Sequence, residues 1–444
     1  MSRLARTGAI VVLALLAAAC GNGDDDPPAE GTTPVDAEEI DYEAIGLWDD
    51  GPCDESKPPL VVGTSTVFES SVISLGDLAI ALAAAAEGFN QRGGANGACI
   101  EVHTCDDGAT VEQSLKCARE LDEAGIVATI NDTTTAGNEE VAAAHAAAGI
   151  PRVATNVSPS DWADPNAFPI DASSTGSTLL MPQALVQEGV TEIGIVRADL
   201  AQTSALIGIL EGMYEDDGAT FPMDVAVPPS TTDYSQFILK ANEAKVGGIL
   251  LAVGEQEAVQ VVNAAQQLSS TFGIAATLGS FPADAVEGFG EFSEHMLFLS
   301  AFPPATFDLP VYEALRADLA ASGKDALQPG QLKVTSMRSW IGLYALLRMI
   351  RDAGLTDFTR ANITTMLQEA EEVPMLDIFG GEDWTPNKVH EGAFQRVGTS
   401  HWGVFKWDLD AENPVGLDGN FVQVATLDWN EVVCGSPFGA PPPC

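Results

Sequence analysis

Positively charged residues are scarce in this chain. Its 444 residues include 20 lysines and arginines against 64 aspartates and glutamates, a formal net charge of −44. A surface with this excess of negative charge repels nucleic acid and anionic lipid headgroups, so neither is expected as a partner. The excess is typical of a well-solvated or salt-tolerant surface, and it does not by itself identify a ligand.

The sequence motifs that mark common enzyme classes are also missing. The chain has no Gly-x-Ser-x-Gly, Gly-x-x-x-x-Gly-Lys, His-Glu-x-x-His or Gly-x-Gly-x-x-Gly pattern. Its histidines are few and far apart, namely His103, His145, His295, His390 and His401. His145 falls in an alanine-rich helical stretch, where a packed or surface role is expected. We therefore expect no catalytic residue, no metal site and no cofactor.

Long apolar runs are absent after the first twenty residues, so no later membrane span is expected. The N-terminus combines Arg3 and Arg6, a short apolar run and the sequence Leu16-Ala17-Ala18-Ala19-Cys20. This pattern predicts a signal peptide over residues 1–19, and it resembles a bacterial lipobox in which Cys20 becomes the acylated N-terminus. The expected location is outside the cytoplasm, with the membrane reached through a lipid anchor. Residues 20–57 are rich in Asp, Glu, Pro and Gly, and are expected to form a disordered tether.

Six cysteines remain after Cys20, and no Cys-x-x-Cys pair is present. An even number in an exported chain predicts three disulfides. Cys105 and Cys117 are the best local pair, because the first closes an expected strand and the second lies in the helix that follows. Cys53 with Cys99 and Cys434 with Cys444 are favoured more weakly, since six cysteines allow 15 pairings.

From Leu60 onward, strands and helices alternate. Strands are expected at Leu60–Thr64, Ile100–Thr104, Val127–Asn131 and Arg152–Ala154, with helices at Gly76–Gln91, Thr110–Ala124 and Glu139–Ala148. A second series from about Thr178 has expected strands at Glu192–Arg197, Val225–Val227 and Gly248–Val253, and helices at Ser204–Asp216, Ser235–Lys245 and Gln256–Leu268. Further helices (Val311–Ala321, Ser336–Arg351, Arg360–Glu369) and two strands (Trp402–Trp407, Phe421–Leu427) complete the chain. This order predicts an α/β protein with two mostly parallel sheets flanked by helices and a cleft between them.

Hydroxyl and amide residues follow two of the expected strands. Asn131-Asp132-Thr133-Thr134-Thr135 comes after one strand, and Thr155-Asn156-Val157-Ser158 comes after the next. Ligands bind beyond the carboxyl ends of strands in open α/β sheets, and hydroxyls with backbone N–H groups there can hold a carboxylate. The same residues are also good helix caps and turn formers, so the pattern alone leaves capping open.

Several short motifs, in this order and spacing, resemble the branched-chain amino-acid type of extracytoplasmic solute-binding protein. They are Val61-Val62-Gly63, Asn90-Gln91-Arg92-Gly93-Gly94-Ala95-Asn96-Gly97, Asp106-Asp107, Gln113 to Arg119, Gly149-Ile150-Pro151, Thr232-Asp233-Tyr234-Ser235 and Trp402-Gly403-Val404-Phe405-Lys406-Trp407. The resemblance covers roughly residues 59–429. It implies the type I periplasmic binding fold and a receptor that delivers its ligand to an ATP-powered membrane permease. A monomer is expected because no exposed apolar stripe in the sequence requires a homodimer, which stays open.

The resemblance also implies where the lobes and the ligand lie. Lobe 1 would comprise residues 58–172 and 301–401, and lobe 2 residues 173–300 and 402–444, with crossovers near 171–174, 299–301 and 401–405. Its carboxylate-binding positions fall on Thr133 and Ser158, with Asn131, Asn156 and Thr134 beside them. Gln202, Glu255 and Phe281 would contact the ligand from lobe 2.

The family's acidic partner for a ligand amine has no clear counterpart here. The corresponding neighbourhood reads Gly279-Ser280-Phe281-Pro282, and two tyrosines common in amino-acid binders are replaced by Gln202 and by Gly254 or Glu255. An uncompensated ammonium in a closed cleft costs several kcal/mol. Either Glu255 or Asp284 takes that role, or the ligand has no amine. A ligand-sensing envelope lipoprotein stays open as an alternative to transport, and an envelope hydrolase is the less favoured one.

Overall fold

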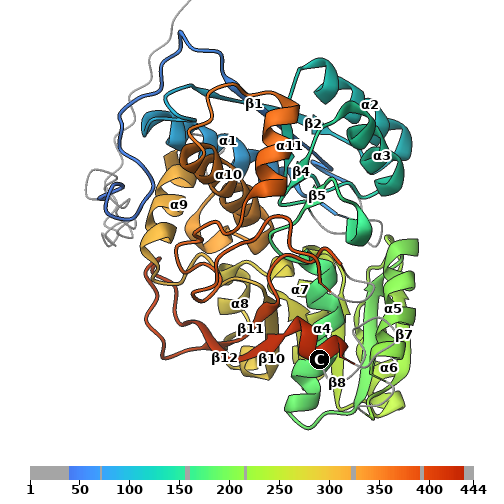
Figure 1. Cartoon of the computed structure of the whole chain (residues 1–444). Helices are drawn as coiled ribbons and strands as arrows, with labels where there is room; N and C mark the ends of the chain where they lie inside the picture. Colours follow the sequence, from blue (N-terminus) through green and yellow to red (C-terminus); the bar gives the residue numbers. More distant parts are fainter. Residues whose placement is uncertain are drawn as a thin grey trace, which may run out of the picture. The chain divides into compact units, whose positions relative to one another are not determined.

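Two β-sheets organise the chain in the computed structural model (Figure 1). The structure describes residues 40–70, 73–155, 161–214, 218–321, 327–390 and 395–434, all within one compact unit, Pro34–Cys444. We call the part built on the first sheet lobe 1 and the part built on the second sheet lobe 2. The expected α/β architecture with two mostly parallel sheets is confirmed.

Lobe 1 contains a five-stranded sheet in the order β2-β1-β3-β4-β5, in which every pairing is parallel. Its strands are β1 (Leu60–Thr66), β2 (Ile100–Asp106), β3 (Ala128–Ile130), β4 (Arg152–Val153) and β5 (Ala167–Phe168). Helices α1 (Gly76–Gln91), α2 (Val111–Glu123) and α3 (Asn138–Ala148) connect them. Two of these helices have a local start or stop in the sequence: the Thr110 hydroxyl caps α2, and Gly149, with φ 69°, ends α3.

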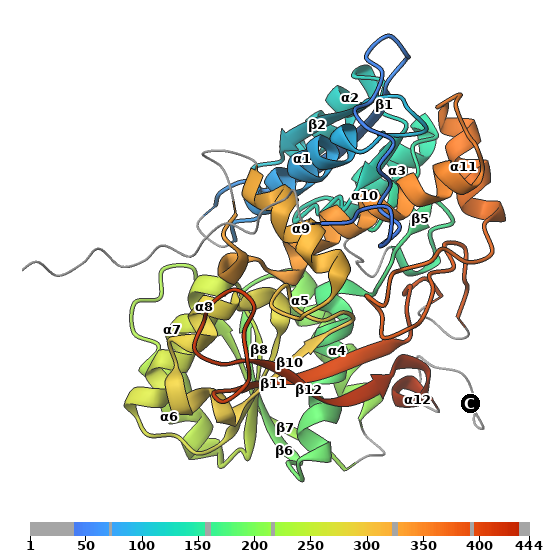
Figure 2. The ribbon, with the colours of Figure 1, turned by 90° about the vertical axis from the view of Figure 1, so that its left-hand side faces the viewer.

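Lobe 2 contains a seven-stranded sheet in the order β12-β11-β10-β9-β8-β6-β7. Its strands are β6 (Glu192–Ala198), β7 (Thr220–Val227), β8 (Gly248–Ala252), β9 (Gly273–Thr277), β10 (Met296–Ser300), β11 (His401–Asp408) and β12 (Asn420–Asp428). The helices of this lobe are α4 (Ser173–Gln187), α5 (Ala201–Met213), α6 (Ser235–Ala244), α7 (Glu255–Gln267), α8 (Ala283–Glu287) and α12 (Trp429–Val433). The neighbouring strands β10, β11 and β12 pair antiparallel, whereas the other pairings are parallel (Figure 2).

The chain passes between the two sheets three times. It leaves the first sheet after β5, returns after β10 through α9 (Pro310–Ala321), α10 (Val334–Asp352) and α11 (Arg360–Glu369), and enters the second sheet again at β11. Within lobe 1, α10 packs against α1 and β3. These three passages place the start of α10, the end of β3 and the start of α4 at the junction of the sheets.

Residues 40–57 are folded against lobe 1 and do not belong to the expected tether. Leu47 is fully buried, and the Trp48 side chain is 4% exposed and donates a hydrogen bond from Nε1 to the Gly94 carbonyl at 3.0 Å. The expectation of a disordered segment reaching residue 57 is therefore wrong for residues 40–57, where an aromatic anchor outweighs an acidic composition. The expected signal peptide and Cys20 lie outside the described residues.

Two of the three expected disulfides are present. Cys105 is bonded to Cys117, and Cys53 is bonded to Cys99, which fixes the segment before β1 to the turn before β2. Cys434 is also disulfide-bonded, but Cys444 lies outside the described residues, so that pairing stays a prediction.

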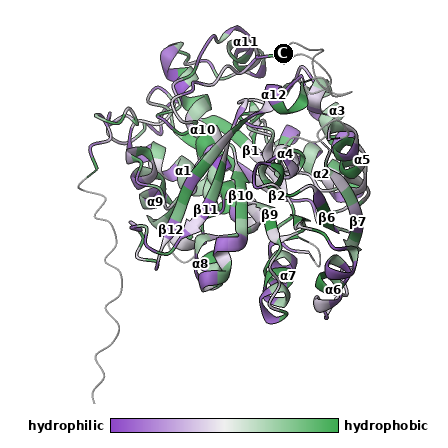
Figure 3. Cartoon of the chain, turned by 90° about the horizontal axis from the view of Figure 1, so that it is seen from below, coloured by the Kyte–Doolittle hydropathy of each residue, from purple (hydrophilic) through white to green (hydrophobic). Residues whose placement is uncertain are grey.

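The elements of lobe 2 differ in how deeply they are buried, and a deeply buried helix lacks the amphipathic pattern by which helices are predicted. Every residue of β10 is buried, and this strand is largely green in Figure 3, whereas α6 and α7 carry purple, hydrophilic residues. The buried helix α4 is not among the expected helices, because Ser, Thr and Gly in its first turns and Pro182 inside it disfavour helix prediction. No helix in the described parts of the chain is both long enough and apolar enough to span a membrane.

Candidate ligand-binding site

A cavity of about 340 Å³ lies between the two sheets and is lined by both lobes. Ligand sites of small molecules occupy cavities of about 300–1,000 Å³. Hydroxyl side chains dominate its polar lining: Ser70, Ser74, Thr133, Thr134, Thr135, Ser174, Thr175, Thr178, Thr203, Thr277, Ser280 and Thr335. Larger aliphatic residues also line it, namely Ile73, Leu75, Leu78, Leu200, Leu206 and Val253, and its charged residues are Glu69, Glu255, Glu257, Lys333 and Arg338. Among the described residues, no aromatic side chain lines this cavity.

Thr133 and Thr134 bring the end of β3 to the cavity, as the strand-end pattern predicts. Thr133 is 5% exposed, its backbone N–H donates to the Ser65 carbonyl at 3.0 Å, and its hydroxyl lies 3.1 Å from the Asn131 carbonyl. Thr134 is 8% exposed, and its hydroxyl has no hydrogen-bond partner in the part of the chain that the structure describes. A buried hydroxyl without a partner costs free energy, so the Thr134 Oγ1 is an obvious point for a ligand oxygen.

Asn131 lies behind the cavity wall and does not line it. Its side-chain amide donates to the Thr335 carbonyl at 2.9 Å and to the Ser339 hydroxyl at 2.8 Å. The side chain is completely buried, and its φ of 49° is one that asparagine tolerates better than most residues. We therefore correct its expected role from ligand contact to a brace that joins the end of β3 to the start of α10.

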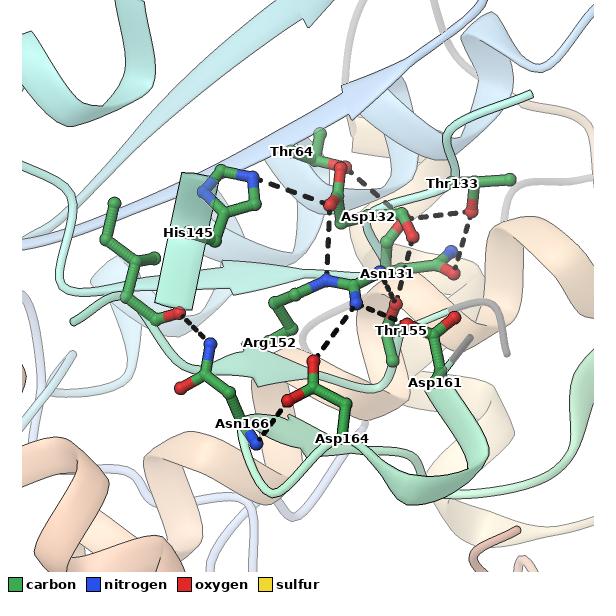
Figure 4. A network of polar contacts seen from close by, with 11 residues as sticks. Thr64, Asn131, Asp132, Thr133, His145, Arg152, Thr155, Asp161, Asp164 and Asn166 are labelled. Carbon is green, nitrogen blue, oxygen red and sulfur yellow. Dashed lines mark hydrogen bonds and ion pairs between the residues drawn. The ribbon is translucent and has the colours of Figure 1, made fainter. Parts of the chain in front are cut away.

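A buried ionic network joins the residues that follow β3 to those that follow β4 (Figure 4). The Arg152 guanidinium, from β4, lies 3.6 Å from the Asp132 carboxylate, donates to the Thr155 hydroxyl at 3.0 Å and is paired with Asp161. Thr155 in turn donates to the Asp132 carbonyl at 3.2 Å. Because Asp132 directly precedes Thr133, this network fixes the backbone that presents the cavity hydroxyls.

His145 closes the far side of this network, 3.6 Å from the Asp132 carboxylate. Burial lowers the pKa of His145, and the nearby Arg152 charge adds to that effect, while Asp132 opposes it. For Arg152, burial disfavours the charged form, but Asp161 and Asp132 outweigh it and raise its pKa. The arginine thus stays charged, with an uncharged imidazole beside the shared carboxylate.

Glu255, at the start of α7, reaches across the cavity to lobe 1. Its Oε2 lies 3.0 Å from the Nζ of Lys333, which lies 3.2 Å from an oxygen of Asp77 as well. Burial disfavours the charged form of Lys333, but Asp77 and Glu255 outweigh it and raise its pKa. One ammonium is therefore shared between two carboxylates, one from each lobe, and the Glu255 charge already has a cation. Asp284, the other acid considered for a ligand amine, does not line the cavity.

Arg338 is the second cation of the cavity wall, and the sequence alone did not reveal it. Its guanidinium donates from Nε and Nη2 to the two oxygens of Asp171, both at 2.8 Å. Asp171 lies in the first passage between the sheets, so this pair joins α10 to that passage. One sign was available in the sequence, namely an arginine among apolar residues in Met337-Arg338-Ser339-Trp340. Its position at the same cavity as Thr133 follows only from the packing of α10 on β3.

The structure does not bring the remaining expected residues to the cavity. Phe281 is 1% exposed and packs on Phe289 and Phe298, with ring centroids 6.0 and 5.6 Å apart, so it belongs to the core of lobe 2 and not to the ligand contacts. Gln202 is in α5, but its side chain is not described, and Asn156 and Ser158 lie outside the described residues. The roles of these last three residues stay predictions.

One cluster of potential metal ligands occurs among the described residues, formed by Cys105, Cys117 and Glu120. The two cysteines are bonded to each other as a disulfide, so their sulfur atoms are not available as thiolates.

Solved structures with the same architecture include proteins named as ABC transporter substrate-binding or solute-binding proteins. A fatty acid ABC transporter substrate-binding protein from Thermomonospora curvata superposes with a TM-score of 0.67 at 18% identity, covering 87% of this chain and 96% of that one. A solute-binding protein from R. palustris in complex with 4-hydroxybenzoate gives 0.66 at 15% identity, covering 84% and 97%. A possible leucine/isoleucine/valine-binding protein from Rhodopirellula baltica gives 0.66 at 16% identity, covering 86% and 100%.

At these identities the likeness is one of fold, and it matches the type I periplasmic binding architecture. No curated protein matches the chain. A family model described as periplasmic binding protein matches residues 60–397, which include both sheets up to the last passage and every cavity residue discussed above. The chain belongs to the periplasmic binding protein family.

Proposed function

We propose that this protein is the receptor of an ABC uptake transporter, that it binds a small carboxylate-, amide- or amino-acid-like ligand between its lobes, and that Cys20 carries its lipid anchor. The cavity supports this function more than any other feature. It is lined by both lobes, so a ligand inside it can contact both and favour their closure. Its hydroxyls suit a polar head, and its aliphatic residues suit a carbon chain.

The ligands named for two structural neighbours support the polar-head part of the proposal. One neighbour is named for a fatty acid, and another holds 4-hydroxybenzoate. Both compounds carry a carboxyl group and no amine. In this chain, Glu255 already has Lys333 as its cation, so this acid is not free to accept a ligand amine, and of the acids that line the cavity Glu69 and Glu257 have no ion pair in the described structure.

The proposal for the membrane rests on the lipobox-like residues before Cys20. We expect metabolic labelling with a fatty acid to mark the full chain and a Cys20→Ala chain to leave the membrane fraction. Retention of the Cys20→Ala chain in that fraction would contradict a lipid anchor.

The binding function is tested with two matched threonine variants. Thermal unfolding of the full-length chain is first screened against carboxylates, amides and amino acids, because a ligand at 100 times its Kd adds about 2.7 kcal/mol of stability. Thr134→Val removes the unpartnered cavity hydroxyl without changing side-chain size. Thr129→Val removes an equally buried and unpartnered hydroxyl from β3, outside the cavity lining.

We expect Thr134→Val to weaken the ligand found in the screen by about tenfold, the worth of one hydrogen bond to a charged group, while the unfolding of the empty protein is unchanged. Thr129→Val should leave the affinity unaltered. Equal affinities for both variants would remove the assignment of the site, and silence of the unmodified chain across the screen would contradict the binding function.

A further inference from the structure

The cavity has one buried cation whose hydrogen-bonding capacity is incompletely used. Arg338 is 3% exposed and lines the cavity, yet only its Nε and Nη2 have acceptors, both on Asp171. A guanidinium carries five N–H donors and does not lose its charge in proteins. In the described residues nothing accepts a hydrogen bond from Nη1. Because Arg338 lines the cavity, these donors are available to an oxygen of a ligand or of water there.

The second cation, Lys333, does not offer the same possibility. Its ammonium lies between Asp77 and Glu255, at 3.2 and 3.0 Å, and so serves two carboxylates already. Arg338 serves one. Of the two cavity cations, Arg338 is therefore the one with charge and donors left for a ligand.

Three helix starts at the cavity favour an anionic partner for Arg338, although Glu69 and Glu257 also line the cavity. Helices α4, α7 and α10 all begin at the cavity, and none of the three has a side-chain hydrogen bond capping its N-terminus. The free N–H groups of a helix start carry partial positive charge and attract anions. Independently, the Thr335 hydroxyl, at the start of α10, is buried without a partner in the described structure, as is the Thr134 hydroxyl.

We propose that the free Nη1 edge of Arg338 binds a carboxylate of the ligand, so that the cleft selects aliphatic carboxylates that carry no ammonium group. This inference rests on the proposed function and adds a ligand class and a specificity residue to it. Thr134 and Thr335 donate to the same carboxylate, and the aliphatic wall, including Leu78 and Leu206, contacts its chain. Asp171 orients the guanidinium, since a fork of two hydrogen bonds fixes its plane.

The molecule provides a matched control for the arginine. Arg92 and Asp318 form another buried, doubly hydrogen-bonded pair, at 2.7 and 2.8 Å, which is not part of the cavity. The experiment compares two double variants. One carries Arg338→Met and Asp171→Asn, and the other carries Arg92→Met and Asp318→Asn, so that each double variant loses one buried charge pair. The probes are 4-methylpentanoate, the isosteric 4-methylpentanamide and L-leucine, and affinity is measured by calorimetry on the full-length chain.

We expect the unmodified chain to bind 4-methylpentanoate more tightly than either other probe. The Arg338 double variant should lose about 100-fold in affinity for it, as two charge-assisted hydrogen bonds disappear, and the Arg92 double variant should stay within about twofold. Arg338→Lys should lose about tenfold, because a lysine keeps the charge but cannot hold Asp171 and the ligand with a planar fork.

A spectroscopic measurement on the unmodified chain does not depend on the folding of variants. With ¹⁵N-labelled arginine, the side-chain resonance of Arg338 should move when 4-methylpentanoate is added, and that of Arg92 should not. Loss of affinity in both double variants alike, or a stationary Arg338 resonance at saturation, would overturn the proposal. Tighter binding of the amide or of leucine would overturn it while leaving the proposed function intact, whereas no binding of any small compound would overturn both.

Discussion

Two buried arginine–aspartate pairs adjoin α10. In each pair one guanidinium nitrogen does not bind the aspartate, and the two pairs differ in the surroundings of that nitrogen. In the Arg92–Asp318 pair, Nη1 and Nη2 hold the carboxylate, the Trp340 indole donates to it at 2.8 Å, and Nε is sealed in the interior without a partner. In the Arg338–Asp171 pair, Nε and Nη2 hold the carboxylate, Nη1 has no acceptor among the described residues, and the arginine lines the cavity. The same kind of ion pair is thus fully enclosed in the core at Arg92, whereas at Arg338 one nitrogen stays available to a ligand.

The packing around the two arginines differs in the same sense. The Arg92 guanidinium lies 4.4 Å from the ring centroid of Tyr42 and 4.7 Å from that of Phe89, whereas Arg338 has one aromatic neighbour, Phe302, at 5.8 Å. Cation–π contacts are strongest at short distance and when the cation is desolvated. The comparison indicates that Arg92 is built for stability and that Arg338 is held ready for an additional partner.

The largest expected effect comes from removing each arginine alone. Arg92→Met leaves Asp318 buried without its cation, and should cost about 3–5 kcal/mol of unfolding free energy. Arg338→Met should cost less, about 2 kcal/mol, since the space it leaves opens toward the cavity and water can reach Asp171. Urea unfolding of the empty chain measures both. Equal costs would break the comparison, because Arg338 would then be as much a part of the core as Arg92.

The difference in unfolding free energy between Arg92→Met and the unmodified chain should become smaller as the pH falls. Burial raises the pKa of Asp318 even with Arg92 present, and loss of Arg92 removes the opposing charge. The variant then takes up a proton on folding, so its relative stability improves as pH falls. A cost that is the same at neutral and mildly acidic pH would contradict this account of the pair.

The fold could be predicted from the sequence because its elements carry local signals. Leu60–Thr66 and Gly248–Ala252 are apolar runs between turn residues, and α2 has both a capping threonine and a clear amphipathic pattern. β9 was missed since Gly273-Ile274-Ala275-Ala276-Thr277 is short and made of small residues, which favour no particular element. The burial of Trp48 was missed because the acidic residues around it dominate the composition.

The site could be predicted only in part, for a different physical reason. Thr133 and Thr134 follow a strand, and the rule for open α/β sheets places such residues at a ligand site. Lys333 and Arg338 reach the same cavity from a helix about two hundred residues later, as the separation of 204 between Asn131 and Thr335 illustrates. No local pattern encodes that approach, because it results from the packing of α10 on β3. Phe281 was misplaced because an aromatic residue after a strand fits a core as well as a cleft.

A third buried arginine, Arg152, differs from Arg92 and Arg338 because a histidine lies next to its aspartate partner. Arg152 shares Asp132 with His145, whose pKa is lowered by burial. The unfolded chain takes up a proton on this histidine near its usual pKa of 6.5, whereas the folded chain does so only at lower pH. Folding stability from this group should therefore fall as pH falls below about 6.5, by at most about 1.4 kcal/mol per pH unit.

The variant His145→Gln should lose this part of the acid dependence, and His295→Gln, at an exposed position, should retain it. Unfolding free energies measured between about pH 7 and pH 5 provide the test. If the unfolding free energy changed with pH by the same amount in both variants, His145 would not be the source of this acid dependence.

The smallest effect is expected from the ion pair that joins the lobes, and its salt dependence is what distinguishes it from the buried pairs. The Glu255 side chain is 41% exposed and that of Lys333 is 12% exposed, against 5% and 4% for Arg92 and Asp318. Glu255→Gln should lower the unfolding free energy by about 0.2–1 kcal/mol at low salt, and this difference should vanish near 1 M NaCl, where the Debye length is about 3 Å. Glu257→Gln is the control, since it removes a charge from the same first turn of α7 without an ion pair in the described structure. A cost for Glu255→Gln that persists in high salt would show that this pair is as shielded from solvent as the buried pairs. A cost that Glu257→Gln reproduces would show that the stabilisation comes from charge in the first turn of α7 and not from Lys333.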